Sequence, residues 1–237
     1  MSARLIRVFK ALLPAPFTIA VVLTLVTFVL AYSLSPNQET PLSLLSYWEK
    51  GLWNSPLLVF AVQMMLMLVL GHVLALTTTI SNWIDKATQF CNNTAQAAAW
   101  VTLLTLLVSF FNWGLGLVFG AIFARKVGEH ATKNNIPLNY PLIGAAGYSG
   151  LMVWHGGISG SAPIKIAEKG HFLEEQIGVI SQSETIFSSM NITISLVLLI
   201  VLPFLMYVLG KKGQSKAINI VSAPIEDEKV EIEGAER

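Results

Sequence analysis

Residues 108–120 read Val-Ser-Phe-Phe-Asn-Trp-Gly-Leu-Gly-Leu-Val-Phe-Gly, which puts Asn112 and three glycines inside an apolar stretch. A second polar interruption, His-Gly-Gly-Ile-Ser-Gly-Ser-Ala-Pro, occupies residues 155–163. Peptide groups inside a bilayer must have their hydrogen bonds satisfied, so a helix broken there needs protein or a water-filled cavity around its free N–H and C=O groups. We therefore expect both interruptions to line a place where a solute binds.

The composition is typical of an integral membrane protein. Of the 237 residues, 54% are hydrophobic and 12% are charged, and the charges lie at the ends of apolar runs or in the carboxyl-terminal tail. A helix needs about 17–25 apolar residues to cross a hydrocarbon core of about 30 Å. Three uninterrupted windows meet this requirement: 17–34, 57–76 and 192–209. The sequence thus predicts an all-α polytopic membrane protein.

Several classes of function lack the residues that they need. Cys91 is the single cysteine, so the chain can form no intrachain disulfide and no cysteine metal cluster. The four histidines lack metal-ligand spacing, and a net charge of +1 without a basic block argues against nucleic acid as a partner. No set of nucleophile, base and metal ligands can be assembled, so we expect neither an enzyme nor a resident cofactor.

The distribution of Lys and Arg predicts the orientation, because short loops rich in these residues stay in the cytoplasm. Arg4, Arg7 and Lys10 place the amino terminus inside, in what we expect to be a bacterial inner membrane. If 98–124 is a re-entrant helical hairpin, the basic loop after it also lies inside, and an interrupted helix over 138–167 then runs outward. This topology puts ten cations inside and three outside.

The end of the chain differs from the rest in composition. Residues 217–237 carry six acidic side chains and no long apolar run. Such a segment buries too little apolar surface to order itself, so we expect a disordered acidic tail. Residues 1–216 form the predicted membrane domain.

The hairpin tip offers donors for an anion. A half-helix that begins near Gly114 directs unpaired N–H groups and a partial positive charge at the space before it, beside Asn112, Trp113 and Gly116. One such terminus contributes about 0.3–1 kcal/mol, and up to about 2 kcal/mol when partly buried, so several donors must converge. The second interruption supplies further candidates for binding a carboxylate: Gly157, Ser159, Gly160 and Ser161.

The absence of Asp and Glu from the apolar spans favours an anionic substrate and leaves the coupling ion open. Na⁺ would bind at carbonyl groups exposed by the helix breaks, whereas H⁺ would use His155, the titratable side chain beside a tip. Plainer interpretations also fit the sequence. In these, Gly114, Gly116 and Gly120 only allow close helix packing, 155–163 is an external turn, and His155 is an interfacial residue.

These motifs resemble the bacterial short-chain fatty acid transporters of the acetoacetate and butyrate type, within the ion transporter superfamily. The resemblance is carried by segments 23–28, 63–72, 112–121, 156–163 and 185–191, of which the two glycine motifs are the specific part. It implies a secondary carrier that moves small monocarboxylates by symport and does not transform them.

Members of that family are longer than this chain, which resembles their amino-terminal half. Their architecture implies two inverted repeats that meet around one site, so the expected partners are a second half-transporter chain or an oligomer, the carboxylate and membrane lipid. A split gene, a truncated chain and self-assembly are three explanations, and the predicted single orientation favours the first two. The alternative function is a non-transporting membrane subunit or scaffold.

Overall fold

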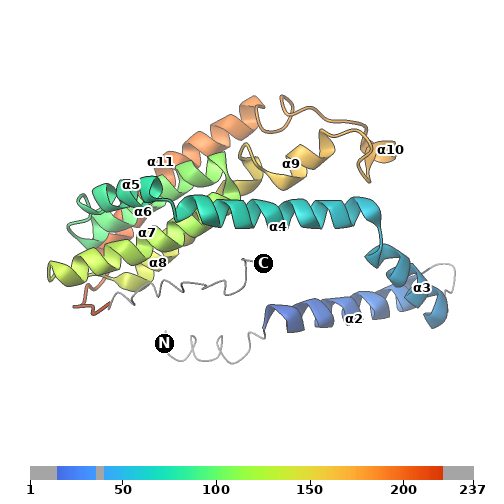
Figure 1. Ribbon diagram of the computed structural model, residues 1–237, viewed down its shortest axis with the longest axis horizontal. Coiled ribbons are helices and arrows are strands. Elements are labelled where there is room, and N and C mark those ends of the chain that lie inside the picture. The colour runs from blue at the N-terminus through green and yellow to red at the C-terminus, as the bar shows by residue number, and fades with distance from the viewer. Residues whose placement is uncertain (1–14, 36–39, 221–237) are drawn as a thin grey trace, which may run out of the picture. The chain divides into compact units, whose positions relative to one another are not determined.

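The computed structural model describes residues 15–35 and 40–220 (Figure 1). The chain divides into two units, Met1–Ala61 and Val62–Arg237, and the boundary between them lies within a helix. The predictions for Arg4, Arg7 and Lys10, and for 221–237 of the acidic tail, lie outside the described residues.

The described part of the first unit holds α2 (Pro16–Leu34), α3 (Pro41–Leu52) and the start of α4 (Ser55–Ala75). A proline lies in the first turn of α2 and of α3, where its missing N–H removes no helical hydrogen bond. Thr40 caps α3, because its side chain accepts a hydrogen bond from Ser43 N–H at 3.2 Å.

Four helices within the described residues are long and apolar enough to cross a membrane. Three of them match the windows predicted from the sequence, except that Leu76 lies one residue beyond its helix, and the fourth is the first arm of the predicted hairpin. The rest of the described chain is helical or irregular, apart from one isolated β-bridge, so the predicted all-α polytopic fold is confirmed. The four spans are Pro16–Leu34, Ser55–Ala75, Thr94–Phe111 and Ser189–Lys212.

The hairpin has longer arms than the sequence predicted (Figure 1). Asn112 alone separates α6 (Thr94–Phe111) from α7 (Trp113–Lys133), and its extended backbone ends one helix and starts the next. The predicted range, 98–124, omits the outer end of both arms. At a rise of 1.5 Å per residue α6 is about 27 Å long, close to the thickness of a hydrocarbon core. The return of the hairpin to one side of the bilayer stays a prediction.

The helix expected over 138–167 is discontinuous. α8 (Tyr140–Tyr148) gives way to the 3₁₀ segments η1 (Ser149–Met152) and η2 (Trp154–Gly156), and α9 (Ser161–Ile166) resumes after an irregular stretch. The resumed helix has only 6 residues and is therefore shorter than expected. The remaining described helices are α5 (Thr78–Thr88), α10 (Glu174–Ile177) and α11 (Ser189–Lys212).

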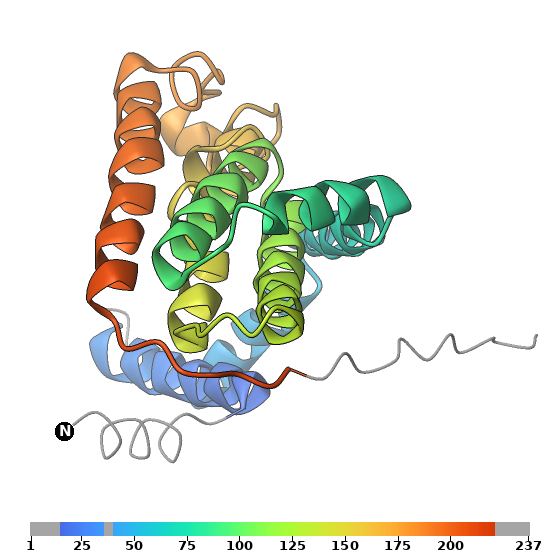
Figure 2. The ribbon, with the colours of Figure 1, turned by 90° about the vertical axis from the view of Figure 1, so that its left-hand side faces the viewer.

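α6 lies at the centre of the second unit, with α7, α8 and α11 packed around it (Figure 2). Glycines allow the helices to approach closely. A Cβ added at Gly210 of α11 would lie 2.6 Å from the Cα of Ala95 in α6, and the backbones of Gly120 and Gly147 meet where α7 crosses α8. Small residues commonly mediate such crossings in membrane proteins.

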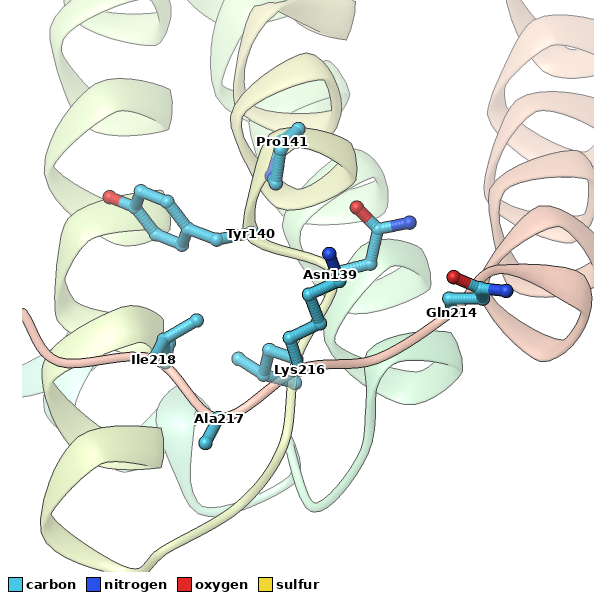
Figure 3. Close-up of a pocket in the computed structure, with 8 residues that line it drawn as sticks. Asn139, Tyr140, Pro141, Gln214, Lys216, Ala217 and Ile218 are labelled. Carbon is cyan, nitrogen blue, oxygen red and sulfur yellow. The ribbon is translucent and has the colours of Figure 1, made fainter.

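The segment 213–220, here named the strap, crosses the end of the bundle where α6 begins (Figure 3). Leu138 and Lys216 form an antiparallel bridge with N···O distances of 2.9 and 3.2 Å, and the hydroxyls of Thr94 and Ser215 lie 2.8 Å apart. The first four residues of the predicted tail, 217–220, thus belong to the strap. Between the strap and the start of α8 lies a cavity of about 440 Å³.

Candidate functional site

The two interruptions lie against each other. Trp113 N–H, in the first turn of α7, donates a hydrogen bond to Ser159 Oγ at 2.9 Å, and Ile158 N–H donates to the carbonyl oxygen of Phe110 at 2.8 Å. Gly157 permits this contact, because a Cβ there would lie 2.5 Å from the same carbonyl oxygen. We name residues 110–113 and 157–159 the tip junction.

The start of α7 is better satisfied than the sequence predicted. Asn112 Oδ1 accepts a hydrogen bond from Leu115 N–H at 2.9 Å, while Ser159 accepts the one from Trp113. Within the part of the chain that the structure describes, Gly114 N–H is the one group among the first three of α7 without a partner. The prediction of several unpaired donors is wrong because Asn112 caps the helix, a role that Asn favours, and starts it at Trp113.

Three aromatic rings beside the tip junction contact one another in a row, each edge-on to the next. The ring of Trp113, which is 9% exposed, meets Trp154 edge-on with 4.9 Å between centroids, and Trp154 meets His155 in the same way at 4.7 Å. The indole Nε1 of Trp113 is buried and has no hydrogen-bond partner among the described residues. A buried donor left unpaired costs about 1–3 kcal/mol, so Trp113 is a donor that lacks its acceptor.

The predicted glycines lie at close contacts. A Cβ at Gly114 would lie 3.0 Å from the carbonyl oxygen of Met67 in α4, and one at Gly116 would collide with Ser109 in α6. A Cβ at Gly160 would lie 2.5 Å from a backbone carbonyl oxygen within its own loop. These contacts support the packing interpretation of the glycines, and their binding roles stay predictions.

The remaining predicted residues surround the tip junction less tightly. Asn112 is half-buried, Ser161 is half-buried at the first position of α9, and His155 is exposed. Among the described residues neither Ser161 nor His155 makes a side-chain hydrogen bond that fixes it to the junction. The structure therefore groups Asn112, Trp113 and Ser159 and leaves the other two at the edge.

Asn191, in the first turn of α11, is a site residue that sequence reasoning left without a role. Its Nδ2 donates to the carbonyl oxygens of Gly156 and Ile186, both at 2.8 Å. Ser188 Oγ in turn caps α11 by accepting a hydrogen bond from Asn191 N–H at 3.2 Å. Asn191 thus fixes the end of η2 to the start of α11, and an Asn three residues after a capping Ser was the available signal.

Two cavities are lined by described residues, and neither includes the residues of the tip junction that were predicted to bind. The cavity beside the strap is described above, and the second cavity, of about 490 Å³, lies between α5 and the hairpin. Its walls are apolar, so it offers no donor to a carboxylate. Its lining residues are Leu74, Ile80, Trp83, Leu104, Leu107, Val108, Phe111, Leu115 and Phe119.

Comparison with known proteins identifies the family. The model of the family described as "Short chain fatty acid transporter" matches residues 1–236. A protein of Escherichia coli (strain K12) is 39% identical over 193 residues, which are 81% of this chain and 42% of that protein. One of Haemophilus influenzae (strain ATCC 51907 / DSM 11121 / KW20 / Rd) is 36% identical over 230 residues, which are 92% and 50%. Both carry the name "Putative short-chain fatty acid transporter".

No solved structure matches the chain. The chain spans about half the length of the curated relatives that it matches. The family match covers nearly all of its residues, and the structure gives it the four apolar helices of a multi-pass membrane protein. The resemblance predicted from the two glycine motifs is therefore confirmed, and the chain belongs to the short chain fatty acid transporter family.

Proposed function

We propose that this chain is one half of a secondary carrier for small monocarboxylates such as acetoacetate or butyrate, and that the carboxylate binds at the tip junction. The observation that carries this proposal is the unpaired indole N–H of Trp113 in the first turn of α7. A buried donor beside a helix N-terminus favours an anionic acceptor, because both present positive partial charge to the same space.

Three donors are available at that point. Gly114 N–H has no partner among the described residues, Trp113 Nε1 has none either, and Ser159 uses its oxygen as an acceptor, which leaves its O–H free to donate. A carboxylate has two oxygens and can accept from all three groups. The edge-on ring of Trp154 then offers an apolar wall for the short alkyl chain.

The junction in the structure is closed, with Ser159 bonded to the start of α7. A carboxylate that enters must therefore break that bond and lie between Ser159 and the hairpin tip, where it still accepts from the Ser159 O–H. Because the carboxylate gains its hydrogen bonds at the expense of the bond between Trp113 and Ser159, we expect a modest affinity. Binding is also coupled to movement of the second interruption. A second half-transporter completes the cavity and alternates its access, with the amino terminus in the cytoplasm of a bacterial inner membrane.

Uptake of labelled acetoacetate and butyrate tests the proposal, in cells that express the chain with and without the remaining half of a relative. Trp113→Phe removes the indole donor and keeps a ring, so it should raise the KM for uptake about tenfold, as expected for one hydrogen bond to a charged group. Trp100→Phe is the matched control, because Trp100 lies toward the start of α6 with its ring against Phe90, whereas the junction lies at the other end of that helix. Absence of uptake in both backgrounds contradicts the proposal.

The packing of the glycines favours a second candidate, a non-transporting membrane subunit. A Cβ at Gly116 or Gly120 would collide with neighbouring helices, as a purely structural hairpin also requires. Purified chain titrated with butyrate separates the two functions. A subunit without a site shows the same unfolding temperature with and without butyrate, whereas a carrier half is stabilised and loses that response in Trp113→Phe.

A further inference from the structure

One face of α6 carries three hydroxyl side chains, Thr102, Thr105 and Ser109, at helical spacing. All three are buried, with exposures of 0%, 1% and 2%. The Oγ1 atoms of Thr102 and Thr105 are fully buried and have no hydrogen-bond partner among the described residues. We name these three residues the hydroxyl seam.

Three other helical threonines among the described residues pair their hydroxyl with the backbone of their own helix. Thr24 donates to the carbonyl oxygen four residues before it at 2.9 Å, and Thr132 does the same at 2.9 Å. Thr88, which is 5% exposed, donates to the carbonyl oxygen three residues before it at 2.7 Å. Such bonding back to the helix is the usual solution for a buried Ser or Thr. The hydroxyls of Thr102 and Thr105 do not make this backbone hydrogen bond, although a buried hydroxyl without a partner costs about 1–3 kcal/mol.

The surroundings explain why no protein group satisfies the seam. The Cγ2 of Thr105 lies 2.9 Å from a Cβ placed on Gly120 and 2.8 Å from one placed on Gly150. The Cβ of Ser109 lies 2.7 Å from a Cβ placed on Gly116. Glycines have no side-chain donor or acceptor, so these three give Thr105 and Ser109 close packing without a side-chain hydrogen-bond partner. Unsatisfied buried polar groups in a native structure call for a ligand, a water or an ion.

The local charge favours a cation over an anion. Ser109 lies in the last turn of α6, and Gly150 lies two residues after the end of α8, so the Ser109 end of the seam lies beside two helix C-termini. The carboxyl end of a helix carries a partial negative charge and presents carbonyl groups without helical partners. The first turn of α7, where the carboxylate is proposed, has the opposite sign, and its Gly116 touches the Ser109 end of the seam, so Thr102 and Thr105 are the members farther from it.

The same surroundings favour a single positive charge. The seam contributes only neutral oxygens, and the described residues contain no cluster of three His, Cys, Asp or Glu side chains. Without a counter-charge the cost of burying an ion rises steeply with its charge, which disfavours Mg²⁺ and Ca²⁺. Hard cations prefer oxygen ligands of this kind.

We propose that the hydroxyl seam binds a dehydrated monovalent cation of the size of Na⁺, between Thr102, Thr105 and Ser109 of α6 and the carbonyl groups at the end of α8. The site differs from the tip junction in residues and in sign. It also differs from His155, which the sequence offered for protons. The proposal stands or fails independently of the carboxylate site, because its test uses no carboxylate.

Thermal unfolding of the purified chain in detergent, followed by tryptophan fluorescence, tests the site with NaCl, KCl or choline chloride at equal ionic strength. NaCl should raise the unfolding temperature of the native chain above its value in choline chloride. Thr102→Val and Thr105→Val keep the shape and remove the hydroxyl. Each should raise the Na⁺ concentration for half-maximal stabilisation about tenfold or more, while unfolding without Na⁺ is unchanged or shifts to higher temperature.

Thr88→Val is the matched control, because it removes a buried hydroxyl that already has a partner. It should lower the unfolding temperature equally in all three salts and keep the response to Na⁺. Two results overturn the proposal. One is a native chain that unfolds at the same temperature in the three salts, which assigns the seam to water. The other is a Na⁺ response that survives in the Thr102→Val, Thr105→Val double variant.

Discussion

α6 and α11 pack against each other, yet they differ in what covers their side chains. α6 buries nine of its 18 residues, whereas α11 buries Pro203 and Gly210 of its 24. The most apolar 18-residue window of α11 has a higher mean hydropathy than α6, which has 18 residues in all. In a membrane protein apolarity therefore does not mark the interior, because lipid tails are as apolar as leucine. Small and hydroxyl-bearing residues mark it instead.

The buried residues of α6 show this pattern. They are Thr94, Ala95, Ala97, Ala98, Val101, Thr102, Thr105, Leu106 and Ser109, most of them small or polar. α11 exposes large apolar residues along its middle, such as Ile200 at 70% and Phe204 at 67%. It is held near its two ends, by Asn191 at the first turn and by Gly210 near the last.

The largest difference between the two helices should appear when a large side chain is truncated. Leu106→Ala in α6 removes a side chain that is 0% exposed, and we expect it to lower the free energy of unfolding by about 2–5 kcal/mol. Ile200→Ala in α11 should change it little, because no protein atoms surround that side chain closely. Unfolding by denaturant in mixed micelles measures both. Equal losses in the two variants would contradict the assignment of α6 as the inner helix.

A smaller effect is expected where a side chain is added rather than removed. Gly120→Val forces a branched side chain against the backbone of Gly147, and we expect a loss of about 1–3 kcal/mol or more. Gly144→Ala is the matched control in α8, since a Cβ there has open space within 4 Å. It should stabilise the chain by about 0.5–1 kcal/mol, as expected for Ala in place of Gly in a helix. Opposite signs in thermal unfolding confirm the crossing of α7 and α8.

Much of the fold could be predicted from the sequence. The windows 17–34, 57–76 and 192–209 all became helices, because uninterrupted apolar runs of that length admit few other structures in a membrane. The break at Asn112 was also predictable from its polar side chain and the glycines that follow it. The length of the arms was not, since α7 continues to Lys133 through a charged segment that packs on its apolar side.

The tip junction was predicted only in part. Two polar interruptions in one chain indicated a shared site, but the bond between Trp113 N–H and Ser159 depends on how α7 and the stretch between η2 and α9 are placed in space. The unpaired hydroxyls of Thr102 and Thr105 were not predictable either. In the sequence they look like ordinary helix residues, because burial and missing partners become visible only when the helices are packed.

Asn191→Ala tests whether α11, unlike the buried α6, is held mainly at its ends, because Asn191 lies in the first turn of α11. Its amide makes two hydrogen bonds of 2.8 Å, to the carbonyl oxygens of Gly156 and Ile186, and we expect its loss to cost about 1–3 kcal/mol. Asn54, which caps α4 through one local bond at 3.1 Å, is the control, and Asn54→Ala should cost about 1 kcal/mol. If Asn191→Ala costs no more than its control, α11 is not anchored to the second interruption.

The smallest effect is expected at Cys91. This residue precedes the start of α6 and is buried in the same apolar cluster as the α6 residues Ala97 and Val101. The side chain is 0% exposed, and burial raises the pKa of its thiol to about 12. Because the thiolate is the reactive form, Cys91 should resist maleimide at pH 8, whereas a cysteine at the exposed position Met190 should react rapidly. Met190→Cys in the native background provides this comparison.

The same raised pKa gives a sign for the pH dependence of stability. The folded state keeps the proton of Cys91 at a pH where the unfolded chain releases it, so its contribution is full below the ordinary pKa of about 9 and is lost as the pH rises toward 12. The difference in free energy of unfolding between the native chain and Cys91→Ala should therefore narrow across that interval. A difference that stays constant from pH 8 to pH 11 would show that the thiol is reached by water, and that the buried face of α6 ends at its first turn.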